Sequence, residues 1–314
     1  MRAMKMLIQS PPVEIVDGLW MLGMNEYPVF LVKDRGEAAI FEGGVGADGP
    51  LVAEQLNRLD IAVDSVKQVV ITHAHPDHVM AAPAFRAMFK DVKICASKTT
   101  AETLAIEKAV KFFTKIDGML TESLLKSGSI TEKHRPEYLT EYKIPVDRIL
   151  ADGDTIAVGG LKFEVLATPG HSDCSLSFHE PQAGIAIISD ITGFYFPDSD
   201  NWWPGYFTNY EAYLESIRRL ADLDAKVVCL SHNSAIKGAD EVRAYFDNAI
   251  AATEAYHERI VTELEAGKSP EELAGQLGTE VYETKPLLPL DFFQKNCALL
   301  VKNSMEYAHK NNRQ

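Results

Sequence analysis

The sequence has few cysteines, no long apolar run and no clear export signal. Its four cysteines (Cys95, Cys174, Cys229 and Cys297) are widely separated and form no CxxC pair. This spacing favours reduced, buried thiols over a disulfide framework. No apolar run reaches the roughly 18 residues that a bilayer-spanning helix needs. The opening segment MRAMKMLIQS is too short in its apolar part for a signal peptide. We therefore expect a cytoplasmic protein without a membrane association.

Basic residues are also scarce. The chain has 31 Lys and Arg against 45 Asp and Glu, a formal net charge of −14. This balance argues against a broad surface for nucleic acid or anionic lipid, and we expect no nucleic-acid partner. The hydrophobic content of 46% is ordinary for a globular protein. A length of 314 residues suits one large α/β domain with appended elements.

Strand-like runs dominate residues 1–238, with helices between them. Apolar runs broken by Gly and Asp predict a β-meander over residues 13–41, and a helix is predicted over residues 49–59. A strand–helix–strand pattern over residues 66–97 predicts a parallel crossover, with Pro83 interrupting its helix. Four further apolar runs lie between residues 161 and 232. Together these patterns predict a layered α/β sandwich.

Two regions depart from this pattern and are predicted to be helical. The first is an insertion over residues 99–142, opened by a capping signature at Thr99 and Glu102. One helical stripe in it is formed by Phe112, Ile116, Met119, Leu120 and Leu124. The second is a C-terminal extension over residues 239–314, in which Ser269 is the predicted N-cap of a further helix. We expect both regions to cover a binding pocket or to form a homodimer interface.

Imidazoles and carboxylates gather in the segment VVITHAHPDHVMAAPAF, residues 69–85. His73 and His75 follow an apolar strand, and side chains two residues apart on a strand point to the same side. The turn that follows brings Asp77 and His78 into the same volume. Imidazole and carboxylate groups suit zinc or iron, and buried imidazoles without a partner would be costly. The motif therefore predicts a metal site.

Three other polar residues directly follow long apolar strands. They are His171, Asp190 and His232. Because ligands in layered α/β folds gather at one edge of the sheets, we expect these three to join the first cluster and complete two metal sites.

The motifs THAHPDH, TPGHSD, SD and SH, in this order and spacing, resemble those of the metallo-β-lactamase-fold hydrolases. The resemblance covers residues 13–235 and implies a four-layer αββα sandwich, with the binuclear centre at the edge that its two sheets share. It implies that His73, His75 and His171 bind one metal. It further implies that Asp77, His78 and His232 bind the other, that Asp190 bridges both, and that Asp77 and Asp190 are catalytic. The two divalent ions are expected to be zinc, with iron or manganese as alternatives.

An aromatic-rich stretch follows Asp190 over residues 192–210. Aromatic side chains here predict either cover for the sandwich edge or an apolar pocket wall beside the metals. On the second interpretation, a tyrosine hydroxyl of this stretch supports the oxyanion of the reaction. The predicted substrate-binding residues are Phe194, Tyr195, Trp202, Trp203 and Tyr206.

These features predict a hydrolase of a small acyl compound (a thioester, ester or lactone) that uses a metal-bridging hydroxide. The inserted helices and helical C-terminus resemble glyoxalase-II-like thioesterases and bacterial quinolone-signal response proteins. One alternative is a phosphodiesterase or ribonuclease of the same fold, against which the acidic charge counts. Another alternative is a metal-containing ligand-binding regulator that acts through a partner.

Overall fold

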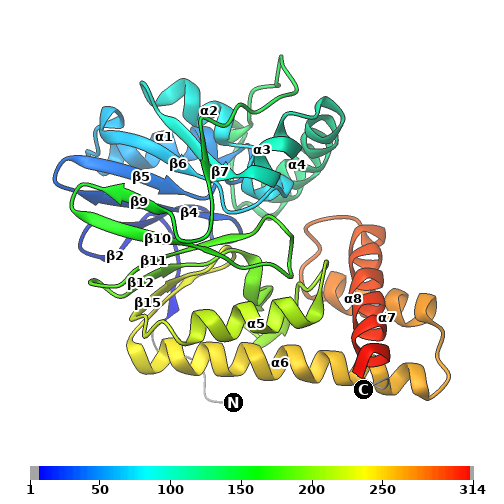
Figure 1. Cartoon of the computed structure of the whole chain (residues 1–314). Helices are drawn as coiled ribbons and strands as arrows, with labels where there is room; N and C mark the ends of the chain where they lie inside the picture. The colour runs from blue at the N-terminus through cyan, green and yellow to red at the C-terminus, as the bar shows by residue number, and fades with distance from the viewer. Residues whose placement is uncertain (1–6, 312–314) are drawn as a thin grey trace.

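Two sheets packed face to face, with helices outside both, form the body of the molecule (Figure 1). The computed structural model describes residues 7–311. Residues 1–6 of the opening segment and residues 312–314 of the predicted extension lie outside this range. Within the range, no helix is both long and apolar enough to cross a membrane.

The first sheet has the strand order β2-β3-β4-β5-β6-β7-β8. Its strands are β2 (Val13–Val16), β3 (Leu19–Gly23), β4 (Pro28–Asp34), β5 (Glu37–Phe41), β6 (Val66–Val70), β7 (Lys93–Ser97) and β8 (Arg148–Leu150). Neighbours from β2 to β5 are antiparallel, which confirms the predicted meander. Neighbours from β5 to β8 are parallel, which confirms the predicted crossover.

The second sheet has the order β1-β16-β15-β12-β11-β10-β9, and β13 and β14 form a separate hairpin. The strands are β1 (Leu7–Ile8), β9 (Thr155–Val158), β10 (Leu161–Ala167), β11 (Leu176–Glu180), β12 (Ile185–Ile187), β13 (Phe194–Phe196), β14 (Asn201–Trp203), β15 (Val227–Cys229) and β16 (Ala235–Lys237). The chain thus closes the second sheet with β1 from its N-terminal part.

Aliphatic side chains and a few phenylalanines fill the space between the two sheets. Phe41 of β5 contacts Phe163 of β10 and Phe178 of β11, with ring centroids 5.0 and 5.2 Å apart. All three rings are fully buried, and each contributes about 1.5–3 kcal/mol relative to an exposed side chain. This core holds the two sheets, and therefore their shared edge, in a fixed relation.

Three helices cover the first sheet: α1 (Asp48–Arg58), α2 (Ala82–Met88) and α3 (Lys98–Leu104). Pro83 lies in the first turn of α2, where its missing N–H costs nothing, so it begins this helix rather than interrupting it. The hydroxyl of Ser97, and not that of Thr99, caps α3 by accepting the N–H of Thr100. The predicted capping position was therefore two residues too late.

The predicted insertion is helical only in its first part. After α3, the chain forms α4 (Glu107–Ser127), which ends at Gly128 in the left-handed conformation. Beyond Gly128 the chain is irregular as far as residue 147, apart from a short 3₁₀ turn at Glu132–His134. The buried face of α4 includes Phe113, whereas Phe112 is 55% exposed at its edge.

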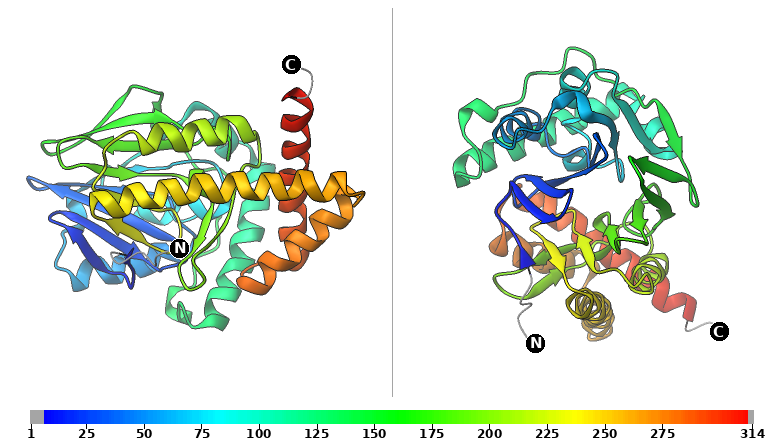
Figure 2. Two further views of the ribbon diagram at one scale, coloured as in Figure 1. Left: turned by 90° about the horizontal axis from the view of Figure 1, so that it is seen from below. Right: turned by 90° about the vertical axis from the view of Figure 1, so that its left-hand side faces the viewer.

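The second sheet is covered by α5 (Tyr210–Ala221) and α6 (Ala239–Glu265), which run side by side (Figure 1). The extension continues as α7 (Pro270–Thr284) and α8 (Leu290–Asn311). Ser269 caps α7 as predicted by accepting the N–H of Glu272. Figure 2 shows that α6 reaches past the sandwich and that α7 and α8 lie beyond it, close to α4.

Candidate metal centre

The seven predicted ligands come from four loops at one edge of the sandwich. The loop between β6 and α2 carries His73, His75, Asp77 and His78. His171 follows β10, Asp190 follows β12 and His232 follows β15. The structure thus brings together all seven residues that the sequence singled out.

The ligand atoms form two groups. In the first, His75 Nδ1 lies 3.0 Å from both His73 Nε2 and His171 Nε2. The second group consists of Asp77, His78 and His232, and within each group the ligand atoms lie within 4.8 Å of one another.

Asp190 lies between the two groups. Its Oδ2 is 3.5 Å from His171 Nε2 and 3.4 Å from His78 Nε2. Its Oδ1 is 3.2 Å from His232 Nε2. One carboxylate therefore reaches ligands of both groups, as expected of a bridge between two ions.

The outer ring nitrogens of these histidines are anchored by the protein. His171 Nδ1 donates to the carbonyl of Gly205 at 2.8 Å, and His232 Nδ1 donates to the carbonyl of Glu26 at 2.9 Å. A carbonyl only accepts, so Nδ1 carries the hydrogen and the Nε2 lone pair points into the cluster. Metal-binding histidines are oriented in this way by their second ring nitrogen.

The donor set fits divalent transition metals. Among residues 7–311, His78 Nε2 and Asp190 Oδ1 are buried without a hydrogen-bond partner. Such atoms carry a desolvation cost unless a cation accepts their lone pairs. Tetrahedral zinc with Zn–N bonds near 2.0–2.1 Å spaces its nitrogen ligands about 3.3 Å apart, close to the separations in the first group.

Burial and neighbouring charges set the protonation of the ligands. Burial lowers the pKa of His171 to about 3, so its imidazole is neutral and ready to bind a metal. Burial raises the pKa of Asp190, but His232, His78 and His171 outweigh it and hold that pKa well below its usual range. The carboxylate of Asp190 is therefore ionised. Both forms are the ones that coordinate cations.

Glu42 is a functional candidate that the sequence reasoning missed. Its carboxylate accepts hydrogen bonds from Thr72 Oγ1 at 3.0 Å, from His78 Nδ1 at 3.0 Å and from Ser231 Oγ at 2.9 Å. The residue is 1% exposed and has φ of 81°. That conformation costs about 1–3 kcal/mol for a residue other than glycine. The three hydrogen bonds hold Glu42 there, and through Nδ1 it orients His78.

A cavity of about 280 Å³ opens directly from the metal ligands. His75, Asp77, His171 and Asp190 form its polar end. Most of the remaining wall is apolar, and Lys285 is the one cationic side chain among its described lining residues. Cavities of this kind, with a few convergent polar groups, are typical small-molecule sites.

The appended helices supply much of the cavity wall. Helix α4 contributes Phe112, Phe113, Ile116 and Leu120. The segment from α7 to α8 contributes Val281, Leu287, Leu288, Phe292, Phe293 and Leu299. Both regions that the sequence marked as a cover or an interface thus enclose this space.

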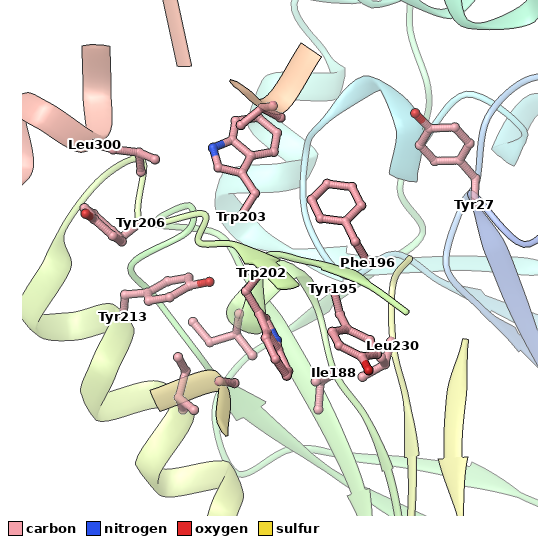
Figure 3. Close-up of a cluster of buried hydrophobic side chains, with 14 of the residues drawn as sticks. Tyr27, Ile188, Tyr195, Phe196, Trp202, Trp203, Tyr206, Tyr213, Leu230 and Leu300 are labelled. Carbon is pink, nitrogen blue, oxygen red and sulfur yellow. The ribbon is translucent and has the colours of Figure 1, made fainter. Parts of the chain in front are cut away.

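Only part of the aromatic stretch lines the cavity. Phe194, Phe196, Trp203 and Phe207 do. The predicted substrate-binding residues Tyr195, Trp202 and Tyr206 are not among the described lining residues. The rings of Tyr195 and Trp202 lie next to each other, with centroids 4.4 Å apart and planes tilted by 38° (Figure 3). Both rings also contact Tyr245 of α6. Their place is in the core under the cavity.

The tyrosine hydroxyls of this stretch are also occupied elsewhere. The Tyr195 hydroxyl donates to Asp200 at 3.0 Å, and the Tyr206 hydroxyl lies 3.0 Å from that of Ser304 in α8. The third tyrosine, Tyr210, stacks on His257 of α6, with ring centroids 4.2 Å apart. None of the three is among the described residues that line the cavity, so the stretch does not place a tyrosine hydroxyl beside the metal ligands.

Fold and site together define a protein with two adjoining groups of candidate metal ligands at the edge of an αββα sandwich. A family model described as the metallo-beta-lactamase superfamily matches residues 26–232, which is more than half of the chain. The chain belongs to this superfamily.

Individual relatives are distant. A hydroxyacylglutathione hydrolase of Cereibacter sphaeroides is 25% identical over 217 residues, covering 69% of this chain and 66% of that protein. An acyl-coenzyme A thioesterase, MBLAC2, of Gallus gallus is 24% identical over 207 residues, covering 63% of this chain and 68% of that one. The match covers just under two thirds of the length of the first relative.

A solved structure shares the whole fold. It is a metallo-beta-lactamase family protein from Thermus thermophilus, with a TM-score of 0.64 and 22% identity. The similarity covers 94% of this chain and 96% of that one, so it includes the helical extension.

We expect the protein, purified without chelator, to contain two transition-metal ions per chain, because two groups of ligand atoms share Asp190. Elemental analysis of the protein measures this directly. A content that stays at one ion per chain or less after supplementation with zinc, iron or manganese would contradict the binuclear assignment.

Proposed function

We propose that the protein is a hydrolase of an acyl ester or thioester with an apolar acyl group. We propose further that it uses two divalent ions, with zinc as the first choice for their identity. The observation that carries the proposal is the direct opening of the seven-ligand cluster into an apolar cavity. The names of two relatives, an acylglutathione hydrolase and an acyl-coenzyme A thioesterase, support the same substrate class.

When bound, the two ions supply an activated water and polarise the acyl oxygen. The protein orients the other participants. Asp77, whose side chain is 20% exposed, lines the cavity and can accept a hydrogen bond from the attacking water. The apolar wall holds the acyl chain and excludes bulk water from the reacting carbon.

No specific feature of the cavity favours a phosphodiester. Lys285, its one described cationic lining residue, already lies 3.4 Å from the carboxylate of Glu26. A nucleic-acid substrate would need several such cations along its backbone.

We also propose that the protein is cytoplasmic, binds a small molecule rather than nucleic acid or membrane, and forms any homodimer through its helical regions.

A substrate panel tests the proposal. Zinc-loaded protein is offered acyl-coenzyme A and glutathione thioesters, lactones and a bis-phosphodiester. We expect turnover of the acyl compounds. Preferential cleavage of the phosphodiester would overturn the proposal. Tight binding of acyl compounds without turnover would favour a metal-containing regulator instead.

We expect Trp203→Ala to weaken selectivity for long acyl chains, because Trp203 lines the cavity and packs 5.6 Å, between ring centroids, from Phe293 of α8. Each buried methylene is worth about 0.8 kcal/mol, or about fourfold in affinity. Measuring kcat/KM across an acyl series from two to ten carbons gives, for each variant, the slope of log(kcat/KM) against acyl-chain length.

Trp202→Ala is the matched control, since Trp202 is as buried as Trp203 but lies outside the cavity. We expect Trp202→Ala to lower thermal stability and to leave the slope unchanged. Identical slopes for wild type and Trp203→Ala would remove Trp203 from the substrate wall.

A further inference from the structure

Tyr27 is the one tyrosine among the described residues that line the cavity. It lies in the short loop between β3 and β4, far in sequence from the aromatic stretch, and is 4% exposed. Its ring meets that of His232 edge-on, with centroids 5.4 Å apart and planes at 82°. In Figure 3 its hydroxyl points away from the backbone that carries it.

The hydroxyl of Tyr27 is not engaged by the protein. Within residues 7–311 it makes no hydrogen bond, although the ring is almost fully buried. By contrast, the Tyr213 hydroxyl accepts the N–H of Gly205, and the Tyr245 hydroxyl lies 2.8 Å from that of Thr192. The Tyr27 hydroxyl is not one of the fully buried polar atoms that lack a partner, so it is accessible from the cavity and free to donate a hydrogen bond to a bound molecule.

The backbone around Tyr27 is tied to the loop that carries a metal ligand. The carbonyl of Asn25 accepts the N–H of Asn233 at 2.7 Å, and the carbonyl of Glu26 accepts His232 Nδ1–H at 2.9 Å. Pro28 directly after Tyr27 begins β4. The phenol is thus held in a fixed place relative to the metal centre before any substrate binds.

We propose that Tyr27 is a catalytic residue whose hydroxyl donates a hydrogen bond to the acyl oxygen as it becomes negatively charged. The inference rests on the proposed acyl hydrolysis. When a water oxygen bonds to the acyl carbon, the π pair of the carbonyl moves to its oxygen. The pair returns to re-form the carbonyl as the C–O or C–S bond breaks and the leaving group takes the bonding pair. One proton of the water passes by way of Asp77 to the leaving group, and the other goes to solvent as the product acid ionises. Tyr27 keeps its own proton throughout.

The chemistry of the side chain suits this role. Tyrosine has an ordinary pKa near 10, so the phenol is a donor at neutral pH. A donor that is placed in advance, in a site with little water, stabilises developing charge more strongly than water does. The apolar walls around the Tyr27 hydroxyl provide that environment.

Tyr27→Phe tests the assignment, because it removes the hydroxyl and keeps the ring that packs on His232. With an acyl thioester and a p-nitrophenyl ester of the same acyl chain, we expect kcat to fall about 10²–10³-fold, with KM changed less than threefold. Metal content should remain that of the wild type. Tyr138→Phe, the same change at a residue that is 91% exposed, should leave both constants unaltered.

A binding measurement decides the same point without turnover. An octylphosphonate carries a tetrahedral anion at the end of an apolar chain, whereas octanol lacks the anion. By calorimetry we expect the phosphonate to bind Tyr27→Phe at least tenfold more weakly than the wild type, with octanol binding both alike.

Unchanged kcat, a loss confined to KM, or equal phosphonate affinity in the two proteins, including no binding by either, would overturn the role of Tyr27. If the wild type hydrolyses no ester or thioester, the proposed function fails, and the phosphonate comparison still reports on Tyr27.

Discussion

We expect Asp190→Asn to lower acyl hydrolysis by more than about 10²-fold and to reduce the metal content from two ions per chain to one or fewer. Loss of a group that merely orients a ligand costs about 10–100-fold, and Asp190 is itself placed among the ligands. Its two oxygens lie 3.2–3.5 Å from the Nε2 atoms of His78, His171 and His232. An amide keeps the size of the side chain but removes the charge that both ions would share.

The fold should survive this change, because Asp190 follows a strand and contributes no apolar packing. Thermal unfolding of the metal-free proteins tests that expectation, and kcat/KM with elemental analysis tests the main one. Asp64→Asn, at an exposed position far from the cluster, serves as the control. Wild-type turnover in Asp190→Asn would refute the bridging role.

The second large effect is expected for Glu42→Gln. Thr72 and His78 share one carboxylate oxygen of Glu42, and Ser231 donates to the other. A glutamine amide can accept at only one of these two positions and carries no negative charge. His78 then loses the carboxylate that orients it and makes it a stronger ligand. We expect metal affinity to fall about 10–100-fold, with activity restored at high metal concentration.

Competition with a chromophoric chelator measures the affinity of the Glu42 variant. Glu102→Gln, an exposed glutamate on α3, should titrate like the wild type. An unchanged titration curve for Glu42→Gln would mean that Glu42 serves the fold and not the metal centre.

The ligand cluster could be predicted because its signal is local and periodic. His73 and His75 are two residues apart, and His171, Asp190 and His232 each follow an apolar strand. Strand ends at one edge of a sandwich lie close together irrespective of the conformation of the connecting loops. The helical regions were predictable in the same way, from apolar residues that recur every three or four positions.

The division of the aromatic stretch could not be predicted without the β13–β14 hairpin. In that hairpin Phe194 pairs with Trp203, and Tyr195 pairs with Trp202. Side chains alternate along a strand, so the first pair faces the cavity and the second faces the core. A composition rich in aromatics indicates an apolar environment but does not say which residues share a face.

Glu42 and Tyr27 escaped notice for a different reason. Neither residue stands out in the sequence, because the functional role of each depends on groups that are distant in sequence. The carboxylate of Glu42 accepts hydrogen bonds from Thr72, His78 and Ser231, and the ring of Tyr27 contacts that of His232 edge-on. Only the packing of the two halves of the sandwich brings these partners together.

The long helix α6 has a consequence for how the cavity is specified. Its 27 residues extend about 40 Å, and no residue of α6, all of which the structure describes, lines the cavity. Val242, Tyr245, Phe246 and Ala249 are buried in its first half, while its far end carries α7 and α8. One residue inserted or deleted between Ala249 and Ile260 would turn that pair by about 100° and shift it by about 1.5 Å. The wall would then face away from the metal centre. The number of residues in α6 therefore sets the direction in which α7 and α8 face, and with it the shape of the cavity. It does so although no residue of α6 lines the cavity.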